Sequence, residues 1–446
     1  MSERLTSVGL DVGTTSTQLV VSKLTVENRA SSFAVPDMEI TRREVIYKSP
    51  VYFTPLLTGT LVDGGRIREI VEREYRAAGI TRETVDTGAV IITGETSRKE
   101  NARTVLAALS DFAGDFVVAT AGPDLESVLA AKGAGAVAFS ERTGKTVLHM
   151  DIGGGTSNLA LIRDGRIIRT GCLNVGGRLI KFDEEGIITY VSPVLTGLCN
   201  VKVGEPAQED RLAEVARILA GALESAAGRN SCGVADALQT EEAENRWRAP
   251  EEAVTVSFSG GVADCIEGTG DWRQFGDLGV LLGRAIRESR LCSGDYVLGT
   301  ETIRATVIGA GCHSAQLSGS TVFCQNVQLP LKNLPVVHVD DLAEWDRSAG
   351  QEEEPAVLAW PGITSASYGQ IREAARTIAT GNREPLLICL EQDMAKALGQ
   401  ALALELPKDA PILCIDRVRL PEGSYLDIGN PTMDAFPVVV KTLVLR

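Results

Sequence analysis

Short apolar runs and glycine-rich polar turns alternate along the chain, and one such pattern occurs twice. Apolar runs at 7–10 and 18–24 flank Asp11-Val-Gly-Thr-Thr15, which predicts a strand, a tight turn and a second strand. Asp151-Ile-Gly-Gly-Gly-Thr156 lies between apolar runs in the same way, about 140 residues later. The use of one unit twice predicts two lobes related by internal duplication.

Helical periodicity appears between and after these two units. Apolar residues recur at helical spacing from Arg66 to Ala78, and Arg211 to Ala227 carries an apolar stripe, so both segments predict amphipathic helices. Other segments have weaker patterns. Strands are expected at 89–93, 116–119 and 254–258, and helices at 97–110 and 124–132.

The composition shifts after Cys324, where buried strands and helices begin to alternate. Strands are expected at 336–339, 386–390 and 411–415, with helices at 368–379 and 394–404. This alternation predicts a smaller α/β module. We therefore expect a first lobe at 1–145, a second lobe at 146–306, a connector back to the first lobe at 307–324 and a C-terminal module at 325–446.

Composition and charge exclude several classes of function for this chain of 446 residues. The net charge is −15, which disfavours a nucleic acid partner because such a surface repels a polyanion. No run approaches the roughly 20 apolar residues of a membrane helix, and the first residues do not resemble a signal peptide. The nine cysteines form no Cys-x-x-Cys pair, and with three histidines no zinc or iron–sulfur pattern appears. We expect reduced thiols and a cytoplasmic protein.

The first turn combines a carboxylate, a glycine and hydroxyls at the end of a strand. The backbone freedom of Gly13 allows close approach of a ligand, and the N–H groups around Thr14 and Thr15 can face phosphate oxygens. The Asp11 carboxylate can reach a hydrated Mg²⁺. Taken alone, the pattern also fits a plain hairpin with a polar turn.

The second turn strengthens the interpretation, because three successive glycines cost conformational entropy unless the backbone must stay bare. Two such hairpins facing each other across a cleft would clamp a triphosphate, and Asp11 and Asp151 would meet around the metal. The phosphate-binding residues expected here are Gly153, Gly154, Gly155, Thr156 and Ser157.

Two further elements complete the set. A strand leads into Ser259-Gly260-Gly261, which suits packing against a base and ribose, although a simple glycine turn is an equal alternative. The small-residue segments 133–139 and 308–315 predict close approach of two elements, either at a hinge between lobes or in ordinary tight packing.

The order of these elements resembles the superfamily of actin, the sugar kinases and the heat-shock-chaperone ATPases. Residues 9–17 and 151–157 match its two phosphate motifs, 257–262 its adenosine motif, and the small-residue segments its two connectors. The segment 174–178 also resembles the glycine pair that follows the second phosphate hairpin in the chaperones. The resemblance implies a two-lobed, actin-like (ribonuclease H-like) α/β fold that binds ATP and Mg²⁺.

A closer resemblance covers essentially the whole chain. The segments 8–17, 92–101, 150–159, 425–431 and 437–442 resemble the ethanolamine ammonia-lyase reactivating factors. This implies a chaperone-like ATPase that releases damaged cobalamin from ethanolamine ammonia-lyase so that adenosylcobalamin can rebind. It also implies a cytoplasmic location, with an association with a bacterial microcompartment and a homo-oligomer both left open. No Asp-x-His-x-x-Gly cobalamin motif is present, which fits action on the holoenzyme.

Hydrolysis by such a protein requires mainly positioning and charge neutralisation. The resemblance makes Asp11 and Asp151 the metal-binding and catalytic carboxylates of a weak Mg²⁺-dependent ATPase. Glu95 follows a buried strand and is expected to position the attacking water or to help to bind the metal; alternatively it caps the helix expected from about Ser97. His149 is expected to be a hydrogen-bonded core residue.

Two rival functions remain at this stage. A small-molecule kinase on the same fold needs a catalytic aspartate in a first-lobe motif, for which we find no match. An actin-like filament or scaffold would use ATP only to regulate assembly. For the reactivating factor, the surfaces expected to contact the lyase are residues 325–446 and the insertion at 35–55.

Overall fold

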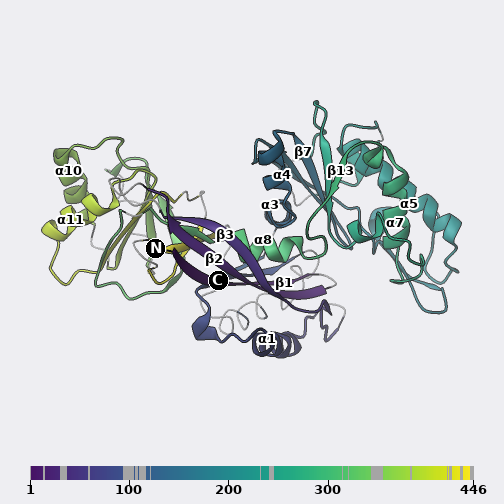
Figure 1. Ribbon diagram of the computed structural model, residues 1–446, viewed down its shortest axis with the longest axis horizontal. Coiled ribbons are helices and arrows are strands. Elements are labelled where there is room, and N and C mark those ends of the chain that lie inside the picture. Colours follow the sequence, from purple (N-terminus) through teal and green to yellow (C-terminus); the bar gives the residue numbers. More distant parts are fainter. Residues whose placement is uncertain are drawn as a thin grey trace.

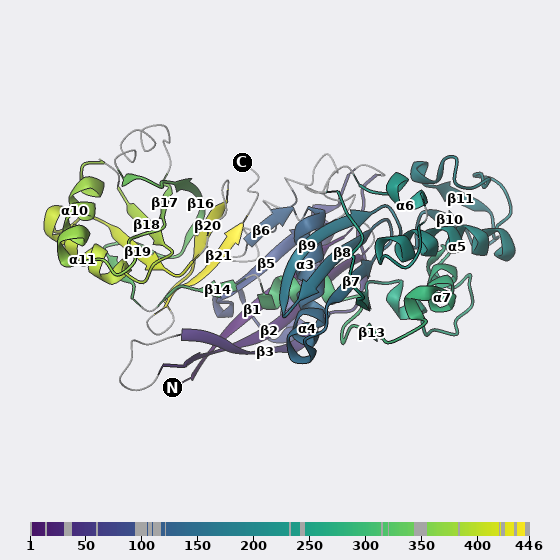
Figure 2. The ribbon, with the colours of Figure 1, turned by 90° about the horizontal axis from the view of Figure 1, so that it is seen from above.

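The computed structural model describes most of the chain in three α/β units. It describes residues 2–13, 16–30, 38–58, 61–93, 105, 109, 117–120, 122–231, 233–240, 246–313, 315–319, 321–342, 355–381, 384–418, 420, 424–431 and 435–441. The first lobe lies between the C-terminal module and the second lobe in both views of the ribbon (Figures 1 and 2). Within the described residues, no helix has both the length and the apolar character needed to span a membrane.

The first lobe is built on a sheet of order β3-β2-β1-β5-β6, with β4 paired to β2. Its strands are β1 (Ser2–Val12), β2 (Ser16–Asn28), β3 (Met38–Lys48), β4 (Tyr52–Phe53), β5 (Thr87–Ile92) and β6 (Val117–Thr120). Strands β1 and β2 are antiparallel, whereas β1, β5 and β6 are parallel. Strands β1 and β2 form the expected hairpin but extend well beyond the apolar runs that predict it.

The second lobe repeats this topology. Its strands are β7 (Val147–Ile152), β8 (Ser157–Arg163), β9 (Arg166–Leu173), β12 (Thr255–Ser259) and β13 (Tyr296–Leu298), in the order β9-β8-β7-β12-β13. Again the first two strands are antiparallel, and β7, β12 and β13 are parallel. A small ribbon of β10 (Ile180–Phe182) and β11 (Ile188–Val191) is added. The matching order and strand directions confirm that one structural unit is used twice.

Helices cover both faces of each sheet because strand residues are apolar on both faces. The helices of the two lobes are α1 (Gly64–Ala78), α3 (Pro123–Gly133), α4 (Ala136–Thr143), α5 (Glu209–Ala226), α6 (Val234–Ala237), α7 (Gly279–Glu288) and α8 (Ala305–His313). Helix α1 packs on one face of the first sheet and α8 on the other. Helices α5 and α7 cover one face of the second sheet, and α3 and α4 the other.

Helix α1 begins at Gly64, before the predicted Arg66, and ends at Ala78 as predicted. The side chain of Asp63 accepts a hydrogen bond from the Arg66 N–H, and Gly79 ends the helix in the left-handed conformation. The helix expected at 97–110 falls largely outside the described residues.

Helices α3 and α8 cross between the two sheets, and glycines allow the contact. A Cβ atom on Gly133 would lie 1.9 Å from the Ala305 carbonyl oxygen, and one on Gly309 would lie 2.0 Å from that of Leu129. Helix α8 also lies against β1, where a Cβ on Gly9 would be 2.4 Å from the Val307 oxygen. The small residues expected in the two connectors therefore serve backbone-to-backbone packing. Helix α8 begins earlier than its predicted segment.

The C-terminal module contains an eight-stranded sheet of order β14-β21-β20-β16-β17-β18-β19-β15. Its elements are β14 (Ala315–Leu317), β15 (Phe323–Gln325), β16 (Leu331–His338), β17 (Val357–Trp360), α10 (Tyr368–Ala379), β18 (Leu386–Leu390), α11 (Ala395–Glu405), β19 (Ile412–Asp416), β20 (Tyr425–Ile428) and β21 (Pro437–Lys441). The central strands β16 to β19 are parallel, as the α/β alternation predicts. The segment after α8 supplies both edge strands, β14 and β15. The four-part division of the chain remains a prediction.

Candidate functional site

The alternation of side chains along β1 and β7 aims two aspartates at the layer between the sheets. In β1, Val8, Leu10 and Val12 pack with α1, so the odd-numbered Asp11 lies on the opposite face, toward α8. In β7, the even-numbered residues pack with α5 and α7, so Asp151 lies on the face covered by α3. Because α3 and α8 pack together between the sheets, both carboxylates face the same layer.

Asp11 has a strongly perturbed environment. Its side chain is 9% exposed, and its Oδ1 accepts a hydrogen bond of 2.9 Å from the Thr93 hydroxyl at the end of β5. Burial raises the pKa of Asp11 to about 7; the Thr93 hydrogen bond lowers it and the charge of Asp151 raises it. The two carboxylates are therefore close enough to repel one another when both are ionised.

Asp151 occupies the equivalent position in the second lobe. The hydroxyl of Ser259, at the end of β12, donates to Oδ1, and the Thr306 hydroxyl on α8 donates to Oδ2 at 3.4 Å. Burial raises the pKa of Asp151 to about 6, and these two hydrogen bonds lower it. Thr306 thus brings the N-terminal turn of α8 to the carboxylate of the second lobe.

His149 contacts Ser259, the residue that donates a hydrogen bond to Asp151. Its Nε2 lies 3.0 Å from the Ser259 hydroxyl and its Nδ1 lies 3.1 Å from the Ser257 hydroxyl. The ring is fully buried, and burial lowers the pKa of His149 to about 3, so the imidazole is neutral. His149 is therefore a hydrogen-bonded core residue, as expected, and it fixes the side chain of Ser259.

The two turns close in the same way. The N–H of Gly13 donates to the Ser16 carbonyl at 2.9 Å, and the N–H of Gly153 donates to the Thr156 carbonyl at 2.9 Å. The first turn is also held by the Thr54 hydroxyl, which donates to the Gly13 carbonyl at 2.7 Å. Matched aspartates thus precede matched turns in both lobes.

Some glycines of the second lobe are required by packing. A Cβ on Gly176 would lie 2.4 Å from the Gly154 oxygen, and Gly260 has φ +86 and would meet the Ile152 oxygen at 2.3 Å. Gly155 and Gly261 differ, because an added Cβ would meet no atom within 4 Å and neither has a positive φ. Neither internal packing nor backbone conformation requires these two glycines, which fits a ligand that needs the bare backbone.

Of the remaining predicted site residues, some lie outside the described part of the chain and others form hydrogen bonds within the protein. Thr14, Thr15 and Glu95 lie outside the described residues. The Ser157 hydroxyl is buried and donates to the Val175 carbonyl at 2.7 Å, and the Ser259 hydroxyl is committed to Asp151. The roles of all predicted site residues in nucleotide binding stay predictions.

The donor set fits a hydrated Mg²⁺ better than a transition metal. Over the described residues, no group of three or more His, Cys, Asp or Glu side chains could hold a metal ion. Magnesium is commonly held by one or two carboxylates, with water and nucleotide phosphates completing the octahedron. Asp11 and Asp151 provide such a pair.

Sequence reasoning missed the hydroxyls that orient the carboxylates. Thr93 follows directly after β5, next to β1 in the sheet, and Ser259 ends β12, next to β7. The usable signal is a hydroxyl at the carboxyl end of the parallel strand beside each aspartate. Thr306 carries no such signal, because it reaches Asp151 only through the path of α8.

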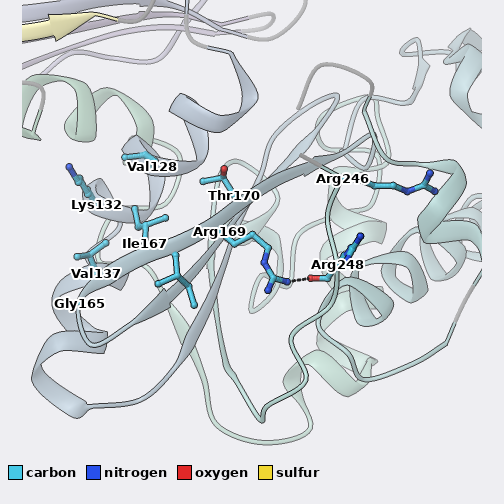
Figure 3. Close-up of a pocket in the computed structure, with 10 residues that line it drawn as sticks. Val128, Lys132, Val137, Gly165, Ile167, Arg169, Thr170, Arg246 and Arg248 are labelled. Atoms are coloured by element: carbon cyan, nitrogen blue, oxygen red, sulfur yellow. Dashed lines mark hydrogen bonds between the residues drawn. The ribbon is translucent and has the colours of Figure 1, made fainter. Parts of the chain in front are cut away.

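A separate cavity of about 680 Å³ lies between α3, α4, β9 and residues 246–248 (Figure 3). Lys132, Arg169, Arg246 and Arg248 line it. Figure 3 shows that Lys132 and Arg246 point away from Arg169, whose Nη1 donates to the Arg248 carbonyl at 2.7 Å. Because these positively charged side chains point in different directions, they do not converge on a common point where an anion could bind.

Comparisons with known proteins give a family match over nearly the whole chain. The model of the family described as "Ethanolamine utilisation protein EutA" matches residues 3–446. Proteins named ethanolamine ammonia-lyase reactivase EutA, from Salmonella typhimurium and Escherichia coli, are each 38% identical to this chain, over 99% of both lengths. A solved structure of the Aquifex aeolicus Ppx/GppA family member is 13% identical with a TM-score of 0.43, over 69% of this chain and 97% of that one. The chain therefore belongs to the ethanolamine utilisation protein EutA family.

Proposed function

We propose that this protein is an ATP-dependent reactivating factor that releases damaged cobalamin from ethanolamine ammonia-lyase so that adenosylcobalamin can rebind. The observation that carries the proposal is the family match over residues 3–446, together with full-length relatives named as reactivases of this lyase. The duplicated aspartate–glycine turns support it, because they supply a physical basis for an ATP-driven motion.

Asp11 and Asp151 would hold hydrated Mg²⁺, and the turns at 13–15 and 153–157 would offer N–H and hydroxyl donors to the phosphates. The 259–261 segment would lie against the adenosine, and Glu95 would position the attacking water. When bound, Mg-ATP supplies a phosphoryl group whose transfer to water releases free energy. Thr93 and Ser259 orient the two carboxylates through their hydroxyl groups.

The lobes would respond through the difference in affinity between ATP and ADP. A ligand that touches both turns favours the arrangement in which they are closest, and loss of the γ-phosphate weakens that preference. The lobes would move relative to one another about the crossing of α3 and α8, where the backbones of the two helices are in contact. The motion would reach the lyase through residues 325–446 or 35–55, in the cytoplasm or at a bacterial microcompartment.

The test is recovery of activity by inactivated enzyme. Ethanolamine ammonia-lyase inactivated with cyanocobalamin is mixed with this protein, adenosylcobalamin, Mg²⁺ and ATP, and ethanolamine deamination is followed. We expect recovery with ATP, and little with ADP or with the Asp11→Asn variant. Equal recovery without any nucleotide would refute the ATP requirement, and no recovery under all conditions would refute the proposed function.

The two rival functions are tested with the same preparation. ATP-dependent phosphorylation of a sugar or polyol with saturation kinetics would favour the kinase. Polymers that sediment only with ATP would favour the filament.

A further inference from the structure

The segment that supports the second turn contains Arg178. Its N–H donates to the Gly154 carbonyl at 2.6 Å, and the N–H of Gly177 donates to the Gly153 carbonyl at 3.0 Å. A Cβ on Gly176 would overlap the backbone of Gly154. Residues 176–178 and the turn at 153–155 therefore move as one unit.

The strand that supports the first turn contains Phe53. Strand β4 pairs with β2 at the point where the turn ends, with Phe53 opposite Ser16. The neighbouring Thr54 hydroxyl holds the Gly13 carbonyl. On the other side, the Tyr52 hydroxyl donates to Glu74 of α1 at 2.6 Å, so β4 is anchored to the body of the first lobe.

These two supports meet. The guanidinium carbon of Arg178 lies 5.9 Å from the centre of the Phe53 ring, within the range of a cation–π contact. Arg178 Nε also donates to Asp277 at 3.2 Å, and this carboxylate is held in turn by the Gly279 N–H at 2.7 Å. The ion pair with the buried Asp277 fixes the position of the guanidinium group.

Phe53 lies on the surface of the protein. Phe53 is 81% exposed, so its ring contributes little to the core of the first lobe. Its ring instead contacts a cation from the other lobe. The contact joins the supports of both turns without touching either carboxylate.

We propose that the Arg178–Phe53 contact is a clasp between the lobes that couples occupation of the two turns to lobe closure. The coupling to nucleotide rests on the proposed function, whereas the contact between Arg178 and Phe53 involves protein atoms alone. Arg178 and Phe53 are positioning residues: a ligand that draws the turns together strengthens their contact, and its loss favours separation of the lobes.

The variants distinguish the effect of the aromatic face of Phe53 from the effect of its apolar size. Phe53→Leu keeps an apolar side chain without the aromatic face, and Phe53→Trp keeps the face. Arg178→Lys keeps the charge opposite Asp277 but loses the planar guanidinium. Leu57→Ala is the matched control, since Leu57 is also exposed (63%) and lies in the same part of the first lobe.

Two measurements are made on the full chain. Isothermal titration gives the affinity for a non-hydrolysable ATP analogue and for adenosine, and small-angle X-ray scattering gives the radius of gyration with and without the analogue. We expect Phe53→Leu to weaken binding of the analogue about twofold to fivefold, as an exposed cation–π contact allows. Adenosine binding should not change. Phe53→Trp should restore the affinity, and Phe53→Leu should have a smaller effect in Arg178→Lys than in the wild type, because lysine keeps the charge but loses the planar guanidinium.

Without nucleotide, Phe53→Leu should have a larger radius of gyration than the wild type, Phe53→Trp and Leu57→Ala. Equal radii for Phe53→Leu and Phe53→Trp would overturn the clasp, whether or not the protein binds nucleotide. Failure of the wild type to bind the analogue would instead count against the proposed function. The two failures are therefore distinguishable.

Discussion

At Asp11, burial favours the protonated carboxyl group, whereas the proposed binding of Mg²⁺ requires the ionised one. In the absence of a cation, Asp11 has a buried carboxyl group whose pKa is about 7, against an ordinary value of 3.8. The folded protein therefore binds this proton more tightly than the unfolded chain. The contribution of Asp11 to stability is full below pH 3.8 and is lost as the pH rises to about 7.

Replacement of Asp11 by asparagine should raise stability and abolish function together. At pH 8 and without Mg²⁺, we expect the free energy of unfolding of Asp11→Asn to exceed that of the wild type by on the order of 1 to 4 kcal/mol. The variant should therefore unfold at a higher temperature. The gain should shrink toward pH 4. ATP hydrolysis should fall to background. Calorimetric melting at both pH values and a phosphate-release assay measure this; a lower melting temperature at pH 8 would contradict the burial argument.

Binding of Mg-ATP should depend on pH through the same group. A cation requires the ionised carboxylate, so affinity should fall roughly tenfold for each pH unit below the Asp11 pKa of about 7. Below the Asp151 pKa of about 6, the affinity should fall more steeply with decreasing pH, because a second carboxylate becomes protonated. Titration calorimetry in buffers of different ionisation enthalpy would reveal the released protons. An affinity that is constant from pH 5.5 to 8 would exclude these carboxylates as ligands.

Substitutions of two neighbouring glycines should separate packing from ligand binding. Gly155→Ala adds a Cβ into open space, so the melting temperature should stay nearly unchanged while nucleotide affinity falls at least tenfold. Gly176→Ala forces a methyl group against Gly154 and should cost about 1 to 3 kcal/mol of stability. Thermal melting and nucleotide titration of both variants check this. Unimpaired binding by Gly155→Ala would show that no ligand approaches this turn.

At the scale of elements, the helix crossing decides how the two sheets are joined. Gly309 lies where α8 touches the Leu129 carbonyl of α3, and no Cβ can be accommodated without a backbone shift. The strands on either side of each aspartate–glycine turn could be predicted because each apolar run is local, whereas β9 and β13 were not predicted. For the crossing, the small residues predicted close packing but not which residues would be in contact, because the partner of each glycine is distant in the sequence.

The Gly309→Ala substitution should be far more harmful than an equivalent change elsewhere. We expect Gly309→Ala to lose about 1 to 3 kcal/mol of stability. The matched control is Gly221→Ala within α5, where a Cβ would meet no atom within 4 Å and removal of a helical glycine should stabilise by about 0.5 to 1 kcal/mol. Urea unfolding gives both values. Similar free energies for the two variants would refute a tight crossing.

The C-terminal module shares its core with the first lobe, which is a feature of the whole molecule. Val439 of β21 packs in one cluster with Leu5, Leu24 and Ala89 of the first sheet. Strand β21 also lies between β14 and β20. The sequence predicts an α/β module here, but its eight-stranded sheet depends on strands from both sides of the parallel core.

Deletion of β21 should therefore disrupt more than one unit. A chain that ends at Phe436 loses the partner of both β14 and β20, and we expect a melting temperature at least 5 °C lower and aggregation. A chain that ends at Lys441 retains the strand and should melt as the wild type does. Differential scanning calorimetry and light scattering compare the two. Wild-type melting of the shorter chain would show that the module does not depend on β21.

The sequence by itself determined the two aspartate–glycine hairpins, the duplication and the family, because these depend on residues that are neighbours in the chain. Only the tertiary structure decided that Thr93, Ser259 and Thr306 hold the carboxylates, and that Arg178 meets Phe53. Those contacts join residues 82 to 155 positions apart, and local pattern carries no information about pairs that only the packing of the sheets and helices brings together.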